Sequence, residues 1–547
     1  MNMTEDHSGS TPLLSHDSDR REDKIDELND DNVTQSERSQ STLIRDVSCL
    51  TLNFVYMLFF SMHLHASNET SHHEYFSQVL ENIKDLYTIA IPTIISGLLT
   101  YGKSAITIHF LGRLGKEALA GGSLAIAMAN ISAYSIISGL ATGMEGISSQ
   151  ACGAQQWNLV GETLQCTIMI LIITCIPISI VWFKCEPILL LFGQDPTITS
   201  IATTYLAFSL PDLVSLSLMS PLKIFMRTQG VTLPLMYSAG LSLLLHALMN
   251  YAVINTFGLG IEAISLVGAI TNLNLIIFVM FFLWYSGACS QSWQGLSWKC
   301  FSHWKPILCQ GVPSCVSVCL EWWWYELLII FSGLLENAAD SMSAYAIIIQ
   351  ATSFMYNFPY ALGLAVSTKV GNELGANRPN KAKSSSFTAL LCACFTAILA
   401  MLSMVTMSRV WGLMYIQDEA VLSLLTATLP IVGLCELGNC PQTTICGVLR
   451  GSARPLSVVN INFISFYAVG LPVAIVMGLV YDFGLLGLMY GLLSAQIVCA
   501  IVMVFMLTRT DWKEEANRAR KLVSGISESN EENNEDMEAV TSAVLLN

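Results

Sequence analysis

Long apolar runs alternate with short polar loops along most of this 547-residue chain. A run of about 20 apolar residues is the length that an α-helix needs to cross a bilayer. The pattern predicts about twelve spans, at residues 84–110, 118–144, 161–183, 197–221, 232–255, 262–286, 309–333, 340–368, 384–408, 420–447, 456–480 and 485–508. We therefore expect an all-α polytopic membrane protein without a soluble domain between its spans.

The second half of the chain repeats the first at a nearly constant offset. A shift of 221 residues aligns Pro313 with Pro92, and similar shifts align further prolines and Gly-Ala segments. Because each copy holds an even number of spans, both copies enter the membrane in the same direction. We expect two parallel six-helix lobes, at 84–286 and 309–510, joined by a cytosolic linker at 287–308.

Composition and charge support a membrane protein with two acidic ends. The chain is 53% hydrophobic and 12% charged, whereas soluble domains are roughly a quarter charged. Residues 1–46 and 511–547 carry most of the net charge of −15, and their polar composition predicts disordered tails. No basic patch indicates a nucleic-acid partner.

The segment at 47–83 is expected to be irregular or interfacial. Its apolar stretch, 47–61, is shorter than the roughly 17 residues that a span requires. An interfacial segment, an error of gene prediction and an extra span all explain it, and we favour the first two. No metal site or cofactor is expected, because the nearby histidines lack acid or Cys partners at ligand spacing; these are His63, His65, His72 and His73.

Basic residues predict the orientation in the membrane. With a cytosolic amino terminus, the inner loops hold Lys223, Arg227, Lys299, Lys305, Arg378, Lys381, Lys383, Arg450 and Arg454. The outer loops then hold Arg113, Lys116, Lys184 and Arg409. The excess of inner basic residues favours cytosolic termini at both ends.

Glu321 is the most informative single residue, because it lies near the middle of an apolar run. A carboxylate at such a depth is costly and usually marks an ion or substrate path. The matching position in the first half is Thr100, so only one lobe carries this acid. We expect Glu321 to bind the coupling proton, since a buried carboxylate can take up and release one.

Four aromatic residues follow Glu321, and we expect one or two of them to contact a flat or cationic solute. Four consecutive residues cover all sides of a helix, so at least two must face lipid or a neighbouring helix. The candidates for substrate binding are Trp322, Trp323 and Tyr325.

The tenth span offers a second polar group. Glu436 and Asn439 are three residues apart and share one helical face. Pro441 frees the carbonyl of Leu437 for water or a ligand, because proline has no N–H to donate. We expect Glu436 to tune the proton site and Asn439 to bind substrate. The alternative is a proline kink whose polar groups satisfy one another.

Other ionisable residues lie in the first lobe or near span ends. Lys103 either pairs with Asp212 or attracts an anionic substrate, and both are candidate substrate-binding residues. His246 lies in the fifth span. Glu145 and Lys369 lie near span ends, where we expect their side chains to reach water.

The chain resembles the plant branch of the multidrug and toxic compound extrusion family. The resemblance covers about residues 80–515 and rests on Glu321 within Cys-Leu-Glu-Trp-Trp, on Asn372-Glu-Leu-Gly-Ala-Asn-Arg-Pro379 and on Gly447-Val-Leu-Arg-Gly451. The sequence Glu436-Leu-Gly-Asn-Cys-Pro-Gln442 is similar to one plant subgroup.

The resemblance implies two lobes in a V that open alternately to each side of the membrane. It also implies an antiporter that exports small organic solutes against protons or sodium, with protons usual in plants. The helix-seven carboxylate of the family corresponds to Glu321. Many relatives carry an Asp where this chain has Asn439, so the usual two-acid arrangement is in doubt.

We therefore expect a proton-coupled antiporter that exports a xenobiotic, secondary metabolite or hormone, and not an enzyme. A membrane sensor for a small anion or hormone, or a lipid flippase, is the alternative. The expected partners are protons, the solute and the bilayer, and we expect a monomer. The plasma membrane, vacuole, endosome and Golgi are all compatible locations.

Overall fold

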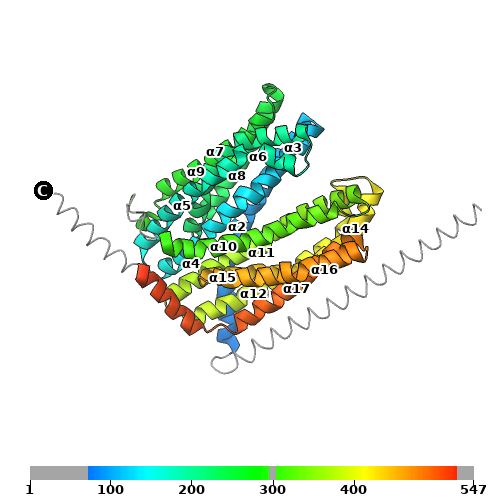
Figure 1. Cartoon of the computed structure of the whole chain (residues 1–547). Helices are drawn as coiled ribbons and strands as arrows, with labels where there is room; N and C mark the ends of the chain where they lie inside the picture. Colours follow the sequence, from blue (N-terminus) through cyan, green and yellow to red (C-terminus); the bar gives the residue numbers. More distant parts are fainter. Residues whose placement is uncertain (1–71, 294, 296–303, 527–547) are drawn as a thin grey trace, which may run out of the picture. The chain divides into compact units, whose positions relative to one another are not determined.

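The computed structural model describes residues 72–293, 295 and 304–526, and every regular element in this part of the chain is a helix (Figure 1). Eleven of the described helical segments are long and apolar enough to cross a membrane. Another long helix, α11 (Ala338–Gly375), is not among these eleven and corresponds to the eighth predicted span. The predicted all-α membrane fold is confirmed. The expectations for residues 1–46, 47–61 and the end of the carboxy-terminal tail concern residues outside the described part.

The first lobe is built from the helices that precede residue 287. They are α2 (His72–Leu114), α3 (Lys116–Ala129), η1 (Asn130–Tyr134), α4 (Ser135–Gly153), α5 (Trp157–Phe183), α6 (Cys185–Leu191), α7 (Pro196–Thr228), α8 (Leu233–Tyr251), η2 (Ala252–Thr256) and α9 (Ile261–Ser286). The π-helical segment η1 joins α3 to α4, so that both belong to one continuous span.

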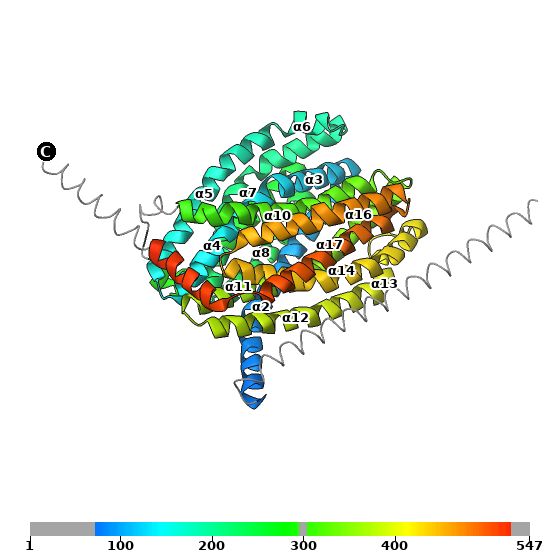
Figure 2. The ribbon, with the colours of Figure 1, turned by 60° about the horizontal axis from the view of Figure 1, so that its bottom comes forward.

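The second lobe follows a short 3₁₀ segment, η3 (Ser290–Ser292). Besides α11, its elements are α10 (Trp304–Ser332), α12 (Pro379–Thr406), α13 (Ser408–Leu413), α14 (Glu419–Gly451), α15 (Pro455–Asn462), η5 (Phe463–Gly470), α16 (Leu471–Ile475), η6 (Val476–Val480) and α17 (Gly484–Thr508). Figure 2 shows α12, α14 and α17 together on one side of this lobe.

The internal repeat is visible in the local structure of the two lobes. A short helix follows the third span of each lobe, α6 in the first and α13 in the second. The next long helix then begins with an aspartate cap. Asp195 accepts hydrogen bonds from the backbone N–H groups of Thr197 and Ile198, and Asp418 does the same for Ala420 and Val421. The cap satisfies donors that the first helical turn leaves free.

Two boundaries differ from the sequence expectation. Helix α2 begins at His72 rather than at 84, and α10 begins at Trp304 rather than at 309. Hydropathy marks only the part of a helix that lies in lipid, whereas the hydrogen-bonded backbone continues into polar sequence at either end. Both helices are therefore longer than their apolar cores.

A further helix occupies residues 512–526, where the sequence predicted a disordered tail from 511. Its apolar side chains are buried against the lobes rather than exposed; Trp512, Ala516, Ala519, Val523 and Ile526 are all at most 7% exposed. The prediction of disorder rested on the charge and polar composition of the whole tail. It overlooked a short amphipathic stretch in which apolar positions recur every three or four residues. We call residues 512–526 the strap helix.

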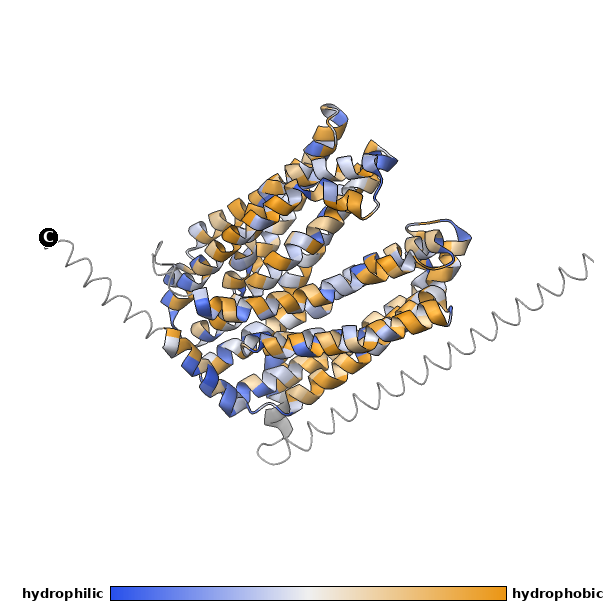
Figure 3. Cartoon of the chain, in the orientation of Figure 1, coloured by the Kyte–Doolittle hydropathy of each residue, from blue (hydrophilic) through white to orange (hydrophobic). Residues whose placement is uncertain are grey.

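The outside of the helix assembly is apolar, as a bilayer requires. Along α5 the side chains of Ile176, Ile180 and Phe183 are 60%, 59% and 68% exposed. Figure 3 shows hydrophobic residues along the outward faces of α5, α9 and α17. Trp284 and Tyr285 lie exposed near the end of α9, the position where aromatic residues gather at a membrane interface.

The two lobes meet along α2, which packs against α11 and α12, and along α4, which packs against α10, α11 and α14. Small residues allow the contact along α4: a Cβ at Gly143 would overlap the Cα of Gly311. The repeated motifs also face each other, since Gly153 abuts the carbonyl of Asn372 and Gly375 abuts that of Gln150. We call this α4 contact with α10, α11 and α14 the seam.

Candidate functional site

Glu321 lies close to the middle of α10, and its side chain is half-buried. The hydroxyl of Tyr356 on α11 donates a hydrogen bond to Glu321 Oε1 over 3.3 Å. Tyr356 itself stacks on Tyr360, with ring centroids 5.5 Å apart. The carboxylate therefore has one protein donor and lies on a face where α10 meets α11, which leaves its second oxygen for a proton, water or solute.

The aromatic residues after Glu321 point to different surroundings. Trp324 is fully buried and packs against Phe466 and Tyr467 of η5. Trp322 and Trp323 are 37% and 41% exposed, whereas Tyr325 is half-buried and its backbone carbonyl accepts a bond from Tyr345. One of the four aromatic residues thus lies in the core and two are exposed. This difference is expected, because four consecutive positions cover the whole circumference of a helix.

Glu436 and Asn439 form a buried pair on α14, as their spacing predicts. Asn439 Nδ2 donates to Glu436 Oε2 over 2.9 Å, and the side chains are 1% and 2% exposed. Cys440 Sγ lies 3.6 Å from the same oxygen, and Thr443 donates to Asn439 Oδ1. Polar partners on α14 thus satisfy much of the hydrogen-bonding capacity of Glu436 and Asn439. This arrangement fits both alternatives, a proline kink whose polar groups bond to one another and a proton site.

Glu321 and Glu436 both lie near Tyr325. Both Glu321 and Glu436 act electrostatically on its hydroxyl, and no hydrogen bond joins the two acids within the described residues. They therefore belong to one polar region of the second lobe but hold separate positions in it.

The first lobe contains a polar network around half-buried Lys103 and buried Asp212. Lys103 Nζ donates to Asn272 Oδ1 over 2.8 Å, and Asn272 Nδ2 donates to Asp212 Oδ1. Tyr134 donates to Asp212 Oδ2 over 2.8 Å. Lys103 and Asp212 are therefore joined through an amide rather than by a direct ion pair.

Two further first-lobe residues have structural partners. His246 is fully buried between Thr107 and Thr271, at 3.1 Å and 2.8 Å from its ring nitrogens. Thr100, the counterpart of Glu321, donates to the carbonyl of Ser96 within its own helix. The described residues contain no group of His, Cys, Asp or Glu side chains that could hold a metal ion.

Sequence reasoning missed a charged cluster at the seam. Glu145 was expected to reach water, but its side chain is 0% exposed. Glu145 Oε1 lies 2.9 Å from Arg227 of the same lobe, and Oε2 lies 3.8 Å from Arg450 of the other lobe. A buried carboxylate requires such partners. The only sequence signal was its pair of neighbouring glycines, Gly143 and Gly146, which permit close helix approach.

The same cluster corrects the assignment of several residues to loops. Arg227 lies in the last turn of α7 and Arg450 in the last turn of α14. Lys223 also lies within α7, half-buried, and no hydrogen bond or ion pair joins it to another described residue. Lys369, also expected at the water, forms an ion pair across the lobes with Asp85 of α2. Charged residues near helix ends are therefore used to hold the lobes together as well as to orient them.

Comparison with known proteins identifies the family. The family model named MatE matches residues 92–252 and matches again at residues 313–476. The chain belongs to the MatE family. The two matches fall one in each lobe, at the spacing of the internal repeat.

Curated relatives of this MatE protein come from Arabidopsis thaliana. Protein DETOXIFICATION 48 is 47% identical over 449 residues, which is 82% of this chain and 84% of the relative. Protein DETOXIFICATION 49 is 44% identical and covers 85% of this chain and 94% of its own length. This MatE protein is thus a member of a plant family of secondary active efflux transporters.

Solved structures share its fold. The eukaryotic MATE transporter AtDTX14 aligns with a TM-score of 0.79 at 28% identity, covering 82% of this chain and all of that one. The Vibrio cholerae MATE transporter VcmN in the bent form aligns with a TM-score of 0.69 at 18% identity, covering 82% of this chain and 99% of that chain, which shows the fold alone. The two-lobed architecture expected from the repeat is confirmed, and the family moves small organic substrates across membranes.

Proposed function

We propose that this MatE protein is a proton-coupled antiporter that exports a small organic solute, with Glu321 as the proton-binding residue. The observation that carries the proposal is a carboxylate near the middle of a membrane-spanning helix with a single protein donor, Tyr356. Such an acid has no structural partner of opposite charge within hydrogen-bonding distance among the described residues. A proton is the ligand that makes it neutral in lipid surroundings.

Glu436 and Asn439 support this role from a neighbouring position. Their hydrogen bond holds Glu436 in place on α14, while Tyr325 lies within the electrostatic influence of both acids. We assign Glu436 to tuning the proton site, and Asn439, Tyr325, Trp322 and Trp323 to contacts with solute. From the sequence around Glu436, we also assign the protein to the plant subgroup that carries Glu-Leu-Gly-Asn-Cys-Pro-Gln.

The first-lobe network gives the solute site a second wall. Lys103, Asn272 and Asp212 form a connected set of charged and polar groups from α2, α9 and α7. The positive charge of Lys103 is already balanced by Asp212 within this network. We therefore assign Lys103 and Asp212 to hydrogen bonding with the solute rather than to selecting a solute of one particular charge. A solute between the lobes meets this network on one side and Glu321 on the other.

The lobe arrangement supports alternating access. The seam closes the ends of α4, α11 and α14, which the excess of basic residues assigns to the cytosolic side. We infer that the structure represents a state closed to the cytosol, with the termini on that same side. Exchange requires only that proton and solute bind the two states with different affinity.

The test is ethidium efflux from proteoliposomes under an imposed pH gradient. We expect Glu321→Gln to abolish the response of efflux to the gradient, because glutamine cannot exchange a proton. Glu326→Gln is the matched control, since this half-buried acid lies five residues further along α10 on another face. Efflux by Glu321→Gln with an unchanged pH dependence would overturn the assignment.

A further inference from the structure

The strap helix crosses from one lobe to the other on the side of the seam. It follows α17 after the three residues 509–511, and its 15 residues extend over about 22 Å. Asp511 caps its start by accepting hydrogen bonds from the backbone N–H groups of Lys513 and Glu514. The helix is therefore a defined element with its own start signal rather than a fraying end of α17.

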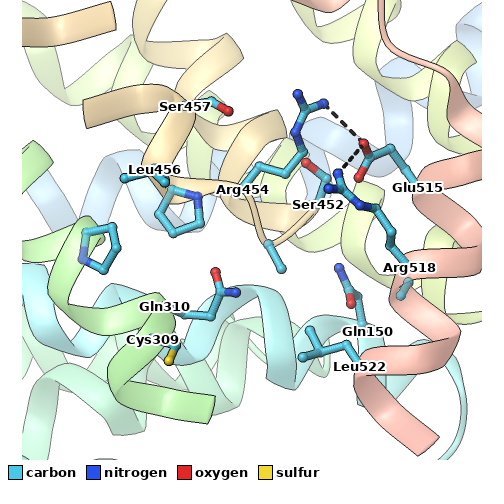
Figure 4. Close-up of a pocket in the computed structure, with 14 residues that line it drawn as sticks. Gln150, Cys309, Gln310, Ser452, Arg454, Leu456, Ser457, Glu515, Arg518 and Leu522 are labelled. Carbon is cyan, nitrogen blue, oxygen red and sulfur yellow. Dashed lines mark hydrogen bonds and ion pairs between the residues drawn. The ribbon is translucent and has the colours of Figure 1, made fainter. Parts of the chain in front are cut away.

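The first half of the strap helix is anchored to the second lobe. Glu515 is 5% exposed, and its Oε1 accepts hydrogen bonds of 3.2 Å from Arg454 and from Arg518. Arg454 precedes the first turn of α15, so this ion pair joins the strap to the turn between α14 and α15 (Figure 4). This half of the strap is therefore held to the second lobe in two ways. Its chain continues directly from α17, and its buried ion pair joins it to Arg454.

The second half of the strap helix joins a hydrophobic cluster made mainly of first-lobe side chains. Val523 and Ile526 belong to this cluster, which also includes Ile307 of α10. Leu522 packs against this cluster. These side-chain contacts are apolar, in contrast to the ion pair that holds Glu515, so they can separate without leaving a buried charge unpaired.

A cavity of about 520 Å³ lies beneath the strap helix, and its walls come from both lobes. Gln150 of α4 lines it together with Gln310 of α10, the residues around Arg454, and Leu522 of the strap (Figure 4). Gln150 also donates to the carbonyl of Gly451 across the seam over 3.0 Å. The strap therefore covers the place where the lobes must part if the seam opens.

We propose that residues 512–526 act as a strap that fastens the first lobe to the second and must leave the first lobe each time the seam opens. The proposal rests on the alternating-access function proposed above. The anchored half stays on the second lobe, and the half with Leu522, Val523 and Ile526 swings away. The strap thereby sets how readily the protein leaves the state closed at the seam.

The experiment ties the strap to either lobe with a reducible cross-link. In full-length protein with Cys309→Ser, since Cys309 also lines the cavity, Gln150→Cys and Leu522→Cys link the strap to the first lobe. The matched control, Leu456→Cys with Ala519→Cys, uses the same cavity and links the strap to the second lobe. Each protein is compared with its own reduced form, which removes the effect of the substitutions themselves.

We expect the first-lobe cross-link to slow ethidium efflux at least about tenfold and reduction to restore it, because the locked lobe cannot change state. The second-lobe cross-link should leave efflux within about twofold of its reduced form, since the strap never leaves that lobe. Equal efflux with and without the first-lobe cross-link would overturn the proposal.

A second readout separates the strap from the transport function. Ser149 of α4 is fully buried, and its Oγ lies against Gly371 of α11 across the seam, so a cysteine at this position reacts with a maleimide only when the two lobes part. The first-lobe cross-link should slow this reaction whether or not ethidium is transported. Absence of efflux from the reduced protein counts against the proposed function, whereas an unchanged labelling rate counts against the strap.

Discussion

At the scale of single residues, the protein holds three carboxylates inside membrane-spanning helices, where lipid alone would not stabilise their charge. Glu321 has one donor, Glu436 has an amide and a thiol, and Glu145 has two arginines. The three environments differ in how far they compensate a negative charge. Two guanidinium groups compensate a buried negative charge more fully than one hydroxyl donor does. This difference is the physical basis for assigning proton coupling to Glu321 and structural closure to Glu145.

The bond between Asn439 and Glu436 gives a prediction at this scale. Asn439→Leu keeps the side-chain volume similar but leaves Glu436 Oε2 without its amide donor, so we expect a loss of about 1–3 kcal/mol in stability. Thermal unfolding of the purified protein in detergent measures it. Cys440→Ser retains a donor to the same oxygen and should change stability by less than about 0.5 kcal/mol. Equal losses of stability in both variants would mean that the hydrogen bond from the Asn439 amide to Glu436 does not stabilise the protein.

At the scale of elements, helix packing depends on where side chains are missing. The helices α4 and α10 approach through Gly143 and Gly311, while α4 and α11 approach through Gly153 and Gly375. Gly153 and Gly375 come from equivalent segments of the two copies, so duplication supplied both halves of that contact. The strap helix shows the same dependence on neighbours, because its amphipathic sequence acquires an apolar surface to bury only once the lobes are assembled.

The seam glycines give a prediction for this scale. Gly143→Ala places a methyl group against the backbone of Gly311, and we expect a destabilisation of about 1–3 kcal/mol from overpacking. Gly268 of α9 is the control, because a Cβ there meets no heavy atom within 4 Å. Gly268→Ala should be neutral or slightly stabilising, since alanine favours the helix by about 1 kcal/mol. The measurement is the thermal unfolding midpoint of each variant. If Gly143→Ala unfolds at the same temperature as Gly268→Ala, the seam can widen without cost.

At the scale of the whole molecule, two lobes of similar fold are joined by contacts of different strength. The seam combines glycine packing with a buried charge cluster, and the strap, whose second half joins an apolar cluster, covers it. Opening requires the separation of Glu145 from Arg450 and the release of the strap from the first lobe. The equilibrium between states thus depends on groups outside the proton site as well as on Glu321.

The strap should respond to pH through Glu515, which lies outside the membrane-spanning helices. Burial raises the pKa of the Glu515 carboxyl above its usual value, against the opposing effect of Arg454 and Arg518, while Glu514 adds to the rise. The anchored half of the strap therefore binds a proton more tightly on the second lobe than it would when detached and solvated. Its attachment to the second lobe is strongest below the usual carboxyl pKa and weakens as the pH rises through the raised value.

A nitroxide spin label at Asn517, an exposed position of the anchored half, measures this change, since its mobility reports attachment without itself titrating. We expect the mobile fraction to grow as the pH rises above the usual carboxyl pKa. Glu515→Gln removes the titrating group and should flatten the profile. A pH response of equal size in both proteins would assign it to another group.

The sequence by itself determined the membrane class, the two-lobed duplication and the outlying acid Glu321. Apolar length, repeat offset and the cost of a buried charge are properties of the chain that need no tertiary contact to be recognised. Spacing also predicted that Glu436 and Asn439 share a face, because helical periodicity is local. The tertiary structure alone decided that Glu145 is buried between arginines of both lobes, that Lys103 meets Asp212 through Asn272, and that residues 512–526 fold against the lobes. Each of these depends on which distant surfaces come together, and a partner hundreds of residues away leaves no periodic trace in a single sequence.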